Sequence, residues 1–588
     1  MKIAKLALAI WLAANATAHA YVQNIVGSGA TRHWELASPP GFVSTNSVNP
    51  TTHAIRYYLA SDGASTTNTA AELNALRASI GQWLAITNTL LKFEEAGVIN
   101  PPVDVNTGDG TNVFYWVKGT TFVNGGNDNI FGALGYTVSS YTASDGTMFE
   151  ADIVFNAHTN AAGATNFWFT DFNDTANTTT FVEGVALHEL GHLLGLSHSP
   201  VGGATMLFRG VSGLNTQAGL SDDDVAGGKF LYATNRTSFG AISGTVTKSG
   251  SPVFGAAVFV QNSASNVVSG TVTRSGGTYE LNMLPPGSYQ VRVAPLDPAT
   301  GTRLVAGVDI ENPGFSSADT AFLPTTNTAV TVTANSTNIV NFTVSNAPPA
   351  FRITRTRKPA SSPLSYSVSS TPVTMTVGQS NYTIGIGLTN MPTNSLTLTI
   401  TGDGLTLGSS IVESNIFANV ILVSVPISVA SNATPGLRNF IVSQSGTNVD
   451  YANAFLEIQP AVPDYNWDGL DDRFQRQYFQ VFTSSNAAPT SDPDGDGMNN
   501  VGEYIAGTVP TNAASVLKMQ SVSRTNNTNT VRWSSVSGKK YQAAYRTNIA
   551  SGSWSNLGSV VTAAGATSLQ TDTTATNAFR AYRVQVLQ

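Results

Sequence analysis

The sequence predicts a multidomain protein in which an α+β domain is followed by all-β sandwich modules and a short Gly/Asp-rich insert. Its 588 residues exceed what one hydrophobic core organises, so several domains are expected. Apolar residues recur at both strand and helix periods up to about residue 233. From about residue 240 they alternate in short segments separated by Gly and Pro, which is typical of antiparallel sandwiches.

Residues 1–20 have the pattern of a secretory signal peptide. Lys2 and Lys5 precede an apolar run over residues 6–14, and Ala18 and Ala20 supply small residues for cleavage. The run is shorter than the about 20 residues that cross a bilayer, and no later run is comparable. We therefore expect a secreted, extracellular protein without a membrane span, with the periplasm or the cell surface as alternatives.

The composition excludes several classes of function. The net charge is -7 and only 11% of residues are charged, which disfavours nucleic-acid binding. The chain has no cysteine, so disulfides, thiolate catalysis and cysteine-ligated zinc are excluded, and any metal must be held by His, Asp, Glu or other oxygen ligands. An exported chain without disulfides is typical of bacteria.

The first domain is expected to span residues 21–236. Strands are predicted over residues 54–60, 113–117 and 151–156, and a helix is predicted over residues 73–84 from its apolar spacing. A second helix should begin near Thr180, because Thr180 and Glu183 have the spacing of a capping box.

The remaining chain divides into β modules. We expect sandwiches at residues 240–344 and 364–460, a linker at 345–363, a calcium-binding segment at 461–512 and a further β domain at 515–588.

The second predicted helix contains the sequence HELGHLLGLSH, residues 188–198. His188 and His192 are four residues apart, so both imidazoles project from one helix face toward a shared cation. Gly195 can adopt the left-handed conformation that ends a helix, and this reversal lets His198 supply a third ligand. Three protein ligands leave the fourth position of tetrahedral zinc open, which is typical of catalytic sites. Glu189 is then placed as a general base.

This stretch matches the zinc signature of the metzincin metallopeptidases, and the chain resembles their matrixin (M10-type) branch over residues 34–233. Met206 lies where the family's Met-turn methionine is found, and Ser199 follows the third His as in matrixins. The resemblance implies a twisted sheet over helices, with a peptide substrate along an edge strand above the zinc. Phe208 differs from the Pro usual in matrixins, and the lack of Cys excludes cysteine-switch latency.

Residues 492–503 have the spacing of a calcium loop, D-x-[DN]-x-[DN]-G-x5-E. Its side chains converge on one ion, and the seventh position contributes only its backbone carbonyl. The expected calcium ligands are Asp492, Asp494, Asp496, Met498 and Glu503.

A second, incomplete loop begins at Asp464 and continues with Asn466 and Asp468, but its twelfth position is Gln475. The two loops together resemble EF-hand or dockerin modules. We interpret them as a structural calcium spacer, with a solvated acidic turn as the alternative.

The β modules resemble extracellular accessory domains. Residues 240–344 are similar to carboxypeptidase regulatory-like sandwiches, as the segments at 244–258 and 284–293 indicate, and the later modules resemble immunoglobulin-like or fibronectin-like domains more loosely. Such modules would bind an extracellular polymer or surface. Trp533 and Trp554 could stack on carbohydrate, but they are expected in a sandwich core.

The resemblance therefore implies a secreted, monomeric zinc endopeptidase that hydrolyses extracellular protein substrates, with catalytic Zn2+ and structural Ca2+. The alternative is a non-enzymatic adhesin or matrix-binding protein with an inactive domain of the same fold. The intact Glu189 argues against this alternative, because an inactive relative has no chemical need for it.

Overall fold

The computed structural model describes residues 22–587, except for 120–121, 131, 159–167, 211–212, 215, 312–313, 328, 363–365, 390–394, 418–419, 447, 549–551 and 577–578. The expected signal peptide lies outside the described residues. The chain divides into two compact units, Met1–Tyr465 and Asn466–Gln588. No helix among the described residues is both long and apolar enough to span a membrane.

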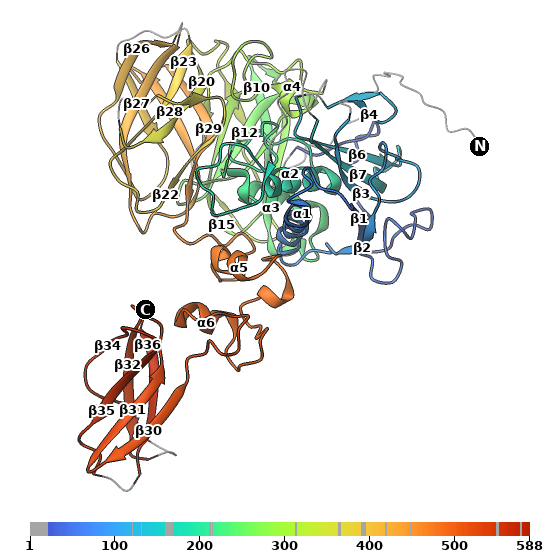
Figure 1. The fold of residues 1–588 in the computed structure, drawn as a ribbon. Coiled ribbons are helices and arrows are strands. Elements are labelled where there is room, and N and C mark those ends of the chain that lie inside the picture. Colours follow the sequence, from blue (N-terminus) through green and yellow to red (C-terminus); the bar gives the residue numbers. More distant parts are fainter. Residues whose placement is uncertain are drawn as a thin grey trace. The chain divides into compact units, whose positions relative to one another are not determined.

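The first domain of unit 1 is a five-stranded sheet packed on helices (Figure 1). The sheet order is β2-β1-β3-β7-β6, in which β6 alone is antiparallel to its neighbour and forms one edge. The elements are β1 (Ile55–Ala60), β2 (Phe93–Ile99), β3 (Val113–Val117), β6 (Gly135–Tyr141), β7 (Met148–Asn156), α1 (Thr69–Leu84), α2 (Val182–Leu194) and α3 (Asp222–Tyr232).

Helix α2 lies in the core of this domain. Its apolar residues Val182, Leu187 and Leu193 are fully buried, and Trp83 of α1 donates its indole N–H to the carbonyl oxygen of Leu187 at 3.1 Å. A helix buried on most of its surface has little freedom to shift, because protein interiors are close-packed. The core therefore fixes the position of every side chain that α2 presents.

The second module is a β sandwich over residues 240–344. One sheet contains β10 (Gly240–Lys248), β11 (Ser251–Pro252), β14 (Thr278–Leu284), β18 (Thr337–Ile339) and β19 (Phe342–Val344). The facing strands are β12 (Ala256–Gln261), β13 (Val267–Val272), β15 (Gly287–Pro295), β16 (Thr325–Thr326) and β17 (Val330–Val332).

The third module shares a sheet with the second, because β13 pairs with β28 (Gly436–Gln444) through Val267 and Leu437. The same sheet continues through β29 (Asn448–Gln459) and β22 (Val373–Thr376), with β24 (Leu396–Ile400) beside β28. A second sheet contains β20 (Arg352–Ala360), β21 (Val368–Ser369), β23 (Tyr382–Thr389), β25 (Leu405–Leu407), β26 (Ile411–Phe417) and β27 (Val420–Val429).

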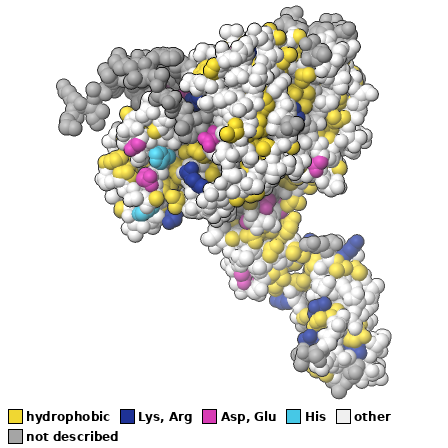
Figure 2. Space-filling model, turned by 180° about the vertical axis from the view of Figure 1, so that it is seen from behind, with side chains coloured by type: hydrophobic (Ala, Val, Ile, Leu, Met, Phe, Trp, Pro, Cys, Tyr) yellow, Lys and Arg dark blue, Asp and Glu magenta, His cyan; other side chains and the backbone are white. Residues whose placement is uncertain are grey.

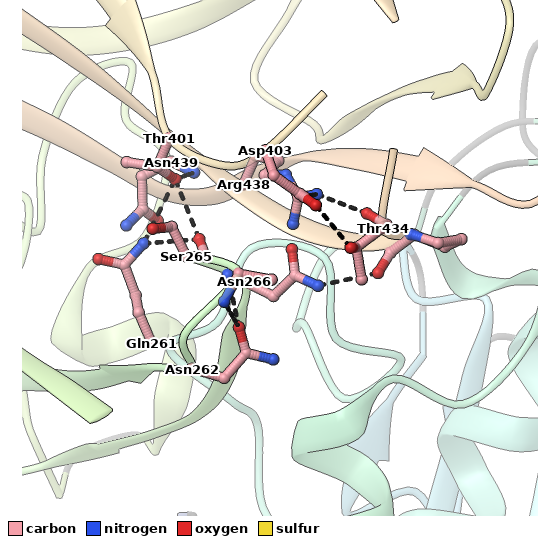
Figure 3. A network of polar contacts seen from close by, with 11 residues as sticks. Gln261, Asn262, Ser265, Asn266, Thr401, Asp403, Thr434, Arg438 and Asn439 are labelled. Carbon is pink, nitrogen blue, oxygen red and sulfur yellow. Dashed lines mark hydrogen bonds and ion pairs between the residues drawn. The ribbon is translucent and has the colours of Figure 1, made fainter. Parts of the chain in front are cut away.

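Side-chain hydrogen bonds reinforce this junction (Figure 3). Thr401 Oγ1 accepts a hydrogen bond from Gln261 at 3.3 Å and donates to the carbonyl oxygen of Ser265 at 3.3 Å. Asn266 donates to the carbonyl oxygen of Pro435 at 2.8 Å. The second and third modules are therefore joined by a shared sheet and by these side-chain hydrogen bonds.

The prediction of a linker at residues 345–363 is wrong, because strand β20 occupies Arg352–Ala360. Its Arg and Lys residues indicated an exposed connection. However, Arg357 is 1% exposed and donates to Glu413 at 3.0 Å and Ser424 at 2.8 Å. A buried Arg with such partners is compatible with a central strand.

Unit 2 contains two short helices, α5 (Asp472–Tyr478) and α6 (Asn500–Ala506), followed by a β domain. Its strands are β30 (Met519–Thr525), β31 (Thr528–Ser534), β32 (Lys540–Arg546), β33 (Ser555–Asn556), β34 (Val561–Thr562), β35 (Thr567–Asp572) and β36 (Ala581–Leu587). Trp533 is fully buried, as the core interpretation predicted. The same prediction is wrong for Trp554, which is half-buried and lies between Arg546 and Arg583. Among the described residues on the face that Figure 2 displays, charged side chains are sparse.

Candidate metal centre

The structure brings His188, His192 and His198 together, with one ring nitrogen of each within 4.8 Å of the others. The Nε2 atoms of His192 and His198 are 3.3 Å apart. The first two residues lie on α2, and His198 follows the turn at Gly195.

Each imidazole is oriented through its other nitrogen. Nδ1 of His188, His192 and His198 lies 2.8 Å from the carbonyl oxygens of Thr205, Leu196 and Asp309, respectively. A carbonyl oxygen only accepts, so each Nδ1 carries the proton and each Nε2 presents a lone pair.

Three inward lone pairs repel one another unless a cation lies between them. Burial, the largest effect, lowers the pKa of all three histidines, and it brings that of His198 to about 3 with the help of nearby His188. The rings are therefore neutral at neutral pH, which is the form that binds zinc. The donor set fits a zinc ion.

Gly195 makes the turn that returns the chain to the site. Its φ of 107° is left-handed, and a Cβ there would lie 2.1 Å from the carbonyl oxygen of Arg32. Both observations exclude a side chain. The predicted role of this glycine is confirmed.

Met206, expected as the Met-turn methionine, packs against Gly191 in the turn of α2 between His188 and His192. It is 2% exposed, and its backbone N–H donates to Asp224 Oδ1 at 3.0 Å. Asp224 also accepts from the N–H of Thr205 at 2.8 Å and caps helix α3 at Ser221. The last helix of the domain thus fixes the loop that supports the metal centre.

Glu189 faces the cavity beside the histidines and is 3% exposed. Thr137 on β6 donates a hydrogen bond of 2.7 Å to Glu189 Oε2. A Cβ at Gly135 would lie 2.5 Å from Glu189 Oε1, so the edge strand approaches closely only because this residue is glycine. Burial raises the pKa of Glu189 to about 8, and the Thr137 hydrogen bond opposes this increase.

The histidines and Glu189 line a cavity of about 630 Å³. Its walls come from the N-terminal segment, the edge strand β6, helix α2, the loop near Phe208 and the short helix α4 (Gly307–Ile310) of the second module. The Phe208 ring lies beside His198, with centroids 6.4 Å apart. A cleft along an edge strand can accommodate an extended peptide.

Helix α2 begins at Val182 after Phe181, and no side chain caps it. The capping box at Thr180 is therefore wrong, because Thr180 lies in strand β9 (Thr180–Phe181), which pairs with β8 (Trp168–Phe169). Sequence reasoning also missed Thr137 and Asp309. Neither belongs to a motif, and only the fold brings them to the histidines.

The acidic loop of unit 2 has the geometry of an ion site. One carboxylate oxygen each of Asp492, Asp494 and Asp496 lies within 4.8 Å of the others. Glu503 is fully buried. Burial, reinforced by the three aspartates, raises its pKa to about 7. Met498 occupies the seventh position, where its N–H donates to Asp496 at 2.8 Å.

The other loop is arranged differently. Within unit 2, Asp468 Oδ2 accepts hydrogen bonds from Gln475 at 2.7 Å and from Asn466 at 3.0 Å. Asp464 precedes this unit. The calcium prediction for this loop stays a prediction.

Comparison with known proteins gives two family matches. Residues 49–233 match the matrixin family model, and residues 241–345 match the model of the carboxypeptidase regulatory-like domain. The chain is 47% identical over 58 residues to the metalloendoproteinase 5-MMP of Arabidopsis thaliana, and 39% identical over 69 residues to 4-MMP of the same plant.

These two alignments cover 10% and 12% of this chain, and the chain spans only 16% and 20% of the length of those relatives. Among solved structures, the minor pilin GBS52 of Streptococcus agalactiae matches with a TM-score of 0.13 and 13% identity, over 20% of this chain and 49% of that one.

Proposed function

We propose that the protein is a secreted zinc-dependent endopeptidase that hydrolyses extracellular protein substrates. The single observation that carries this proposal is the convergence of three neutral imidazoles beside a buried carboxylate in an open cavity. His188, His192 and His198 would hold the ion. When bound, zinc polarises a peptide carbonyl and lowers the pKa of a water molecule.

The chain's own residues supply the proton transfer. The carboxylate of Glu189 takes the proton of the attacking water and returns it to the departing amine of the peptide. Thr137 holds one oxygen of this carboxylate at 2.7 Å, and the other oxygen lies beside Gly135 of the cavity wall. Strand β6 offers its backbone groups to an extended substrate at the cavity wall.

The test uses the purified full chain, its zinc content and a casein digestion assay. We expect one zinc in the metal centre and cleavage of casein, and Glu189→Gln should lower the rate by about 10² to 10⁴ while zinc is retained. Glu183→Gln is the matched control, because Glu183 is a buried carboxylate on the same helix that does not line the cavity. Bound zinc without hydrolysis of any protein substrate would favour the adhesin instead.

We further propose that the loop at 492–503 binds calcium as a structural ion. Carboxylates at its first, third and fifth positions cluster, and their charges act on the buried Glu503, which is not itself part of that cluster. Gly497 has a φ of 94°, which permits the sharp turn that such loops need. A divalent cation would neutralise these carboxylates. In this proposal the β modules bind an extracellular polymer or surface, and the protein is a monomer.

A further inference from the structure

We propose that the second β module contributes to the metal centre, because a segment of this module positions the third histidine, His198. The segment, residues 303–311, is called the strap below. This inference rests on the proposed zinc site, and it makes residues outside the matrixin match part of that site.

The three histidines are oriented in two different ways. The carbonyl groups that fix His188 and His192 belong to Thr205 and Leu196, both within the first domain. The carbonyl that fixes His198 belongs to Asp309 in the strap. His198 lies beyond the end of α2, so the helix does not hold its ring as it holds the other two. The strap supplies the missing constraint.

The strap belongs to a long connection that leaves the sandwich. Strand β15 ends at Pro295 and β16 begins at Thr325, and among the described residues of this connection the single turn of α4 is the only helix or strand. Connections of this length without much secondary structure are uncommon in compact domains and usually serve a function. Here the connection reaches the cavity, where Val308, Asp309, Ile310 and Glu311 form part of the wall.

The strap holds the Asp309 carbonyl in place through its own side chains. Arg303 binds the Asp309 carboxylate with two donors, Nε at 2.8 Å and Nη2 at 2.5 Å. The same carboxylate accepts from the N–H of Ala306 at 2.8 Å, and its side chain is 5% exposed. A bidentate pair fixes direction as well as distance. The peptide unit of Asp309 is therefore held in one orientation.

The strap is also anchored at both sides. Asp297 Oδ2 accepts from the N–H groups of Leu304 and Val305 at 2.8 and 3.1 Å. On the other side, Ser197, the neighbour of the third histidine, donates to the carbonyl oxygen of Ile310 at 3.0 Å.

The first and second modules share a core beneath this contact. Leu304, Ile310 and Phe315 pack in one buried cluster with Val201 and Leu207 of the loop around Met206. Asp223 of α3 links the same surfaces, since it accepts from Ser199 at 2.6 Å and from the N–H of Gly270 in β13 at 2.8 Å. The strap therefore cannot move away from His198 without opening a hydrophobic core.

The test measures zinc affinity of the full chain by competition with a chromophoric chelator, for wild type, Arg303→Ala and Arg303→Lys. Losing an outer partner of a ligating histidine typically costs 10- to 100-fold in metal affinity. We expect such a loss for Arg303→Ala and a smaller one for Arg303→Lys, which keeps the charge but not the bidentate geometry. The visible absorption of the Co2+-loaded protein should change in parallel.

The matched control is Lys248→Met. It breaks another ion pair of the same module, with Asp319, and neither residue lines the cavity. This variant should keep the zinc affinity and cobalt spectrum of wild type. Asp309→Asn is a milder second variant that keeps the backbone carbonyl and side-chain size, and it should weaken zinc binding less than Arg303→Ala.

Equal zinc affinity and unchanged cobalt spectra for wild type and Arg303→Ala would overturn the inference, and so would an equal loss in Lys248→Met. A wild type that binds no zinc contradicts both this inference and the proposed function. A wild type that binds zinc but cleaves no protein contradicts the proposed function alone, because the affinity ratios still decide the role of the strap.

Discussion

The sulfur of Met206 packs against Gly191, in the helical turn between His188 and His192. A Cβ at position 191 would lie 2.2 Å from this sulfur and 3.3 Å from the ring of Trp83. The glycine in the HELGH motif therefore has a packing role, since it lets the thioether approach the helical turn that carries His188 and His192.

The substitution Gly191→Ala should displace Met206 and lower stability by about 1–3 kcal/mol, as overpacking a core does. It should also weaken zinc binding, because the turn it distorts carries two of the ligands. Thermal unfolding and chelator competition measure the two effects. Gly41→Ala is the control, since a Cβ at Gly41 meets nothing within 4 Å. Similar behaviour of both variants would contradict this role of Gly191.

The hydrogen bond from Thr137 to Glu189 should set the acidic limit of activity. The donated hydrogen bond stabilises the carboxylate and lowers its pKa. Thr137→Val removes it, so the pKa of Glu189 rises and the acidic limb of the kcat/KM profile should move to higher pH by about one unit. Ser140→Ala, on the same strand, is the control, because Ser140 bonds Thr107 and does not line the cavity. If the acidic limb of the kcat/KM profile lies at the same pH in Thr137→Val as in wild type, this hydrogen bond does not set the pKa of Glu189.

Calcium should protect the loop at 492–503 from proteolysis. The charges of Asp492, Asp494 and Asp496 repel one another when no cation is bound. We expect chelation to expose residues 460–510 to trypsin, and the pair Asp494→Ala and Glu503→Ala should be equally sensitive with and without calcium. The matched pair Asp464→Asn and Asp468→Asn tests the other loop in the same assay. A wild-type digestion pattern that does not change when chelator or calcium is added would exclude a calcium site at residues 492–503.

Asp450 should make unit 1 less stable as pH rises. Burial raises its pKa to about 7, opposed by Arg352 and by the N–H of Ile353. Because the folded-state pKa lies above the ordinary aspartate value of 3.8, this stabilisation is complete below about pH 4 and is lost as pH rises through 7.

Asp450→Asn keeps an acceptor for Ile353 and does not ionise. Its stability relative to wild type should therefore increase between pH 4 and 7, by at most about 1.4 kcal/mol per pH unit. Urea unfolding of both proteins across this range gives the difference directly. A difference that is constant with pH would show that the carboxyl does not titrate in this window.

The metal centre was accessible from the sequence because its parts are close together in the chain. The spacing of His188 and His192 fixes two ligands on one helix face, and Gly195 makes the return to His198. Glu189 lies in the same stretch, whereas Met206 was expected only from the resemblance to the metzincins. The strands at 113–117 and the helix over 73–84 were predicted from their apolar periods, and the structure contains both.

What the sequence did not predict depends on contacts between distant segments. The Asp309 carbonyl is a backbone group, and no residue pattern identifies it. Strand β20 could not be predicted from the local sequence, because the burial of Arg357 depends on its partner Glu413, which lies in another strand. The sheet shared by the second and third modules likewise depends on pairing between Val267 and Leu437, which local alternation cannot show.

X-ray absorption at the zinc edge of the purified full chain counts the imidazole ligands of the metal centre. We expect three imidazole nitrogens at about 2.0–2.1 Å and one oxygen ligand that exchanges with solvent. His198→Ala should reduce the count to two imidazoles, whereas Glu189→Gln should leave it at three. Fewer than three imidazoles in wild type, or a fourth protein ligand that closes the coordination sphere, would contradict a catalytic metal centre built from these residues.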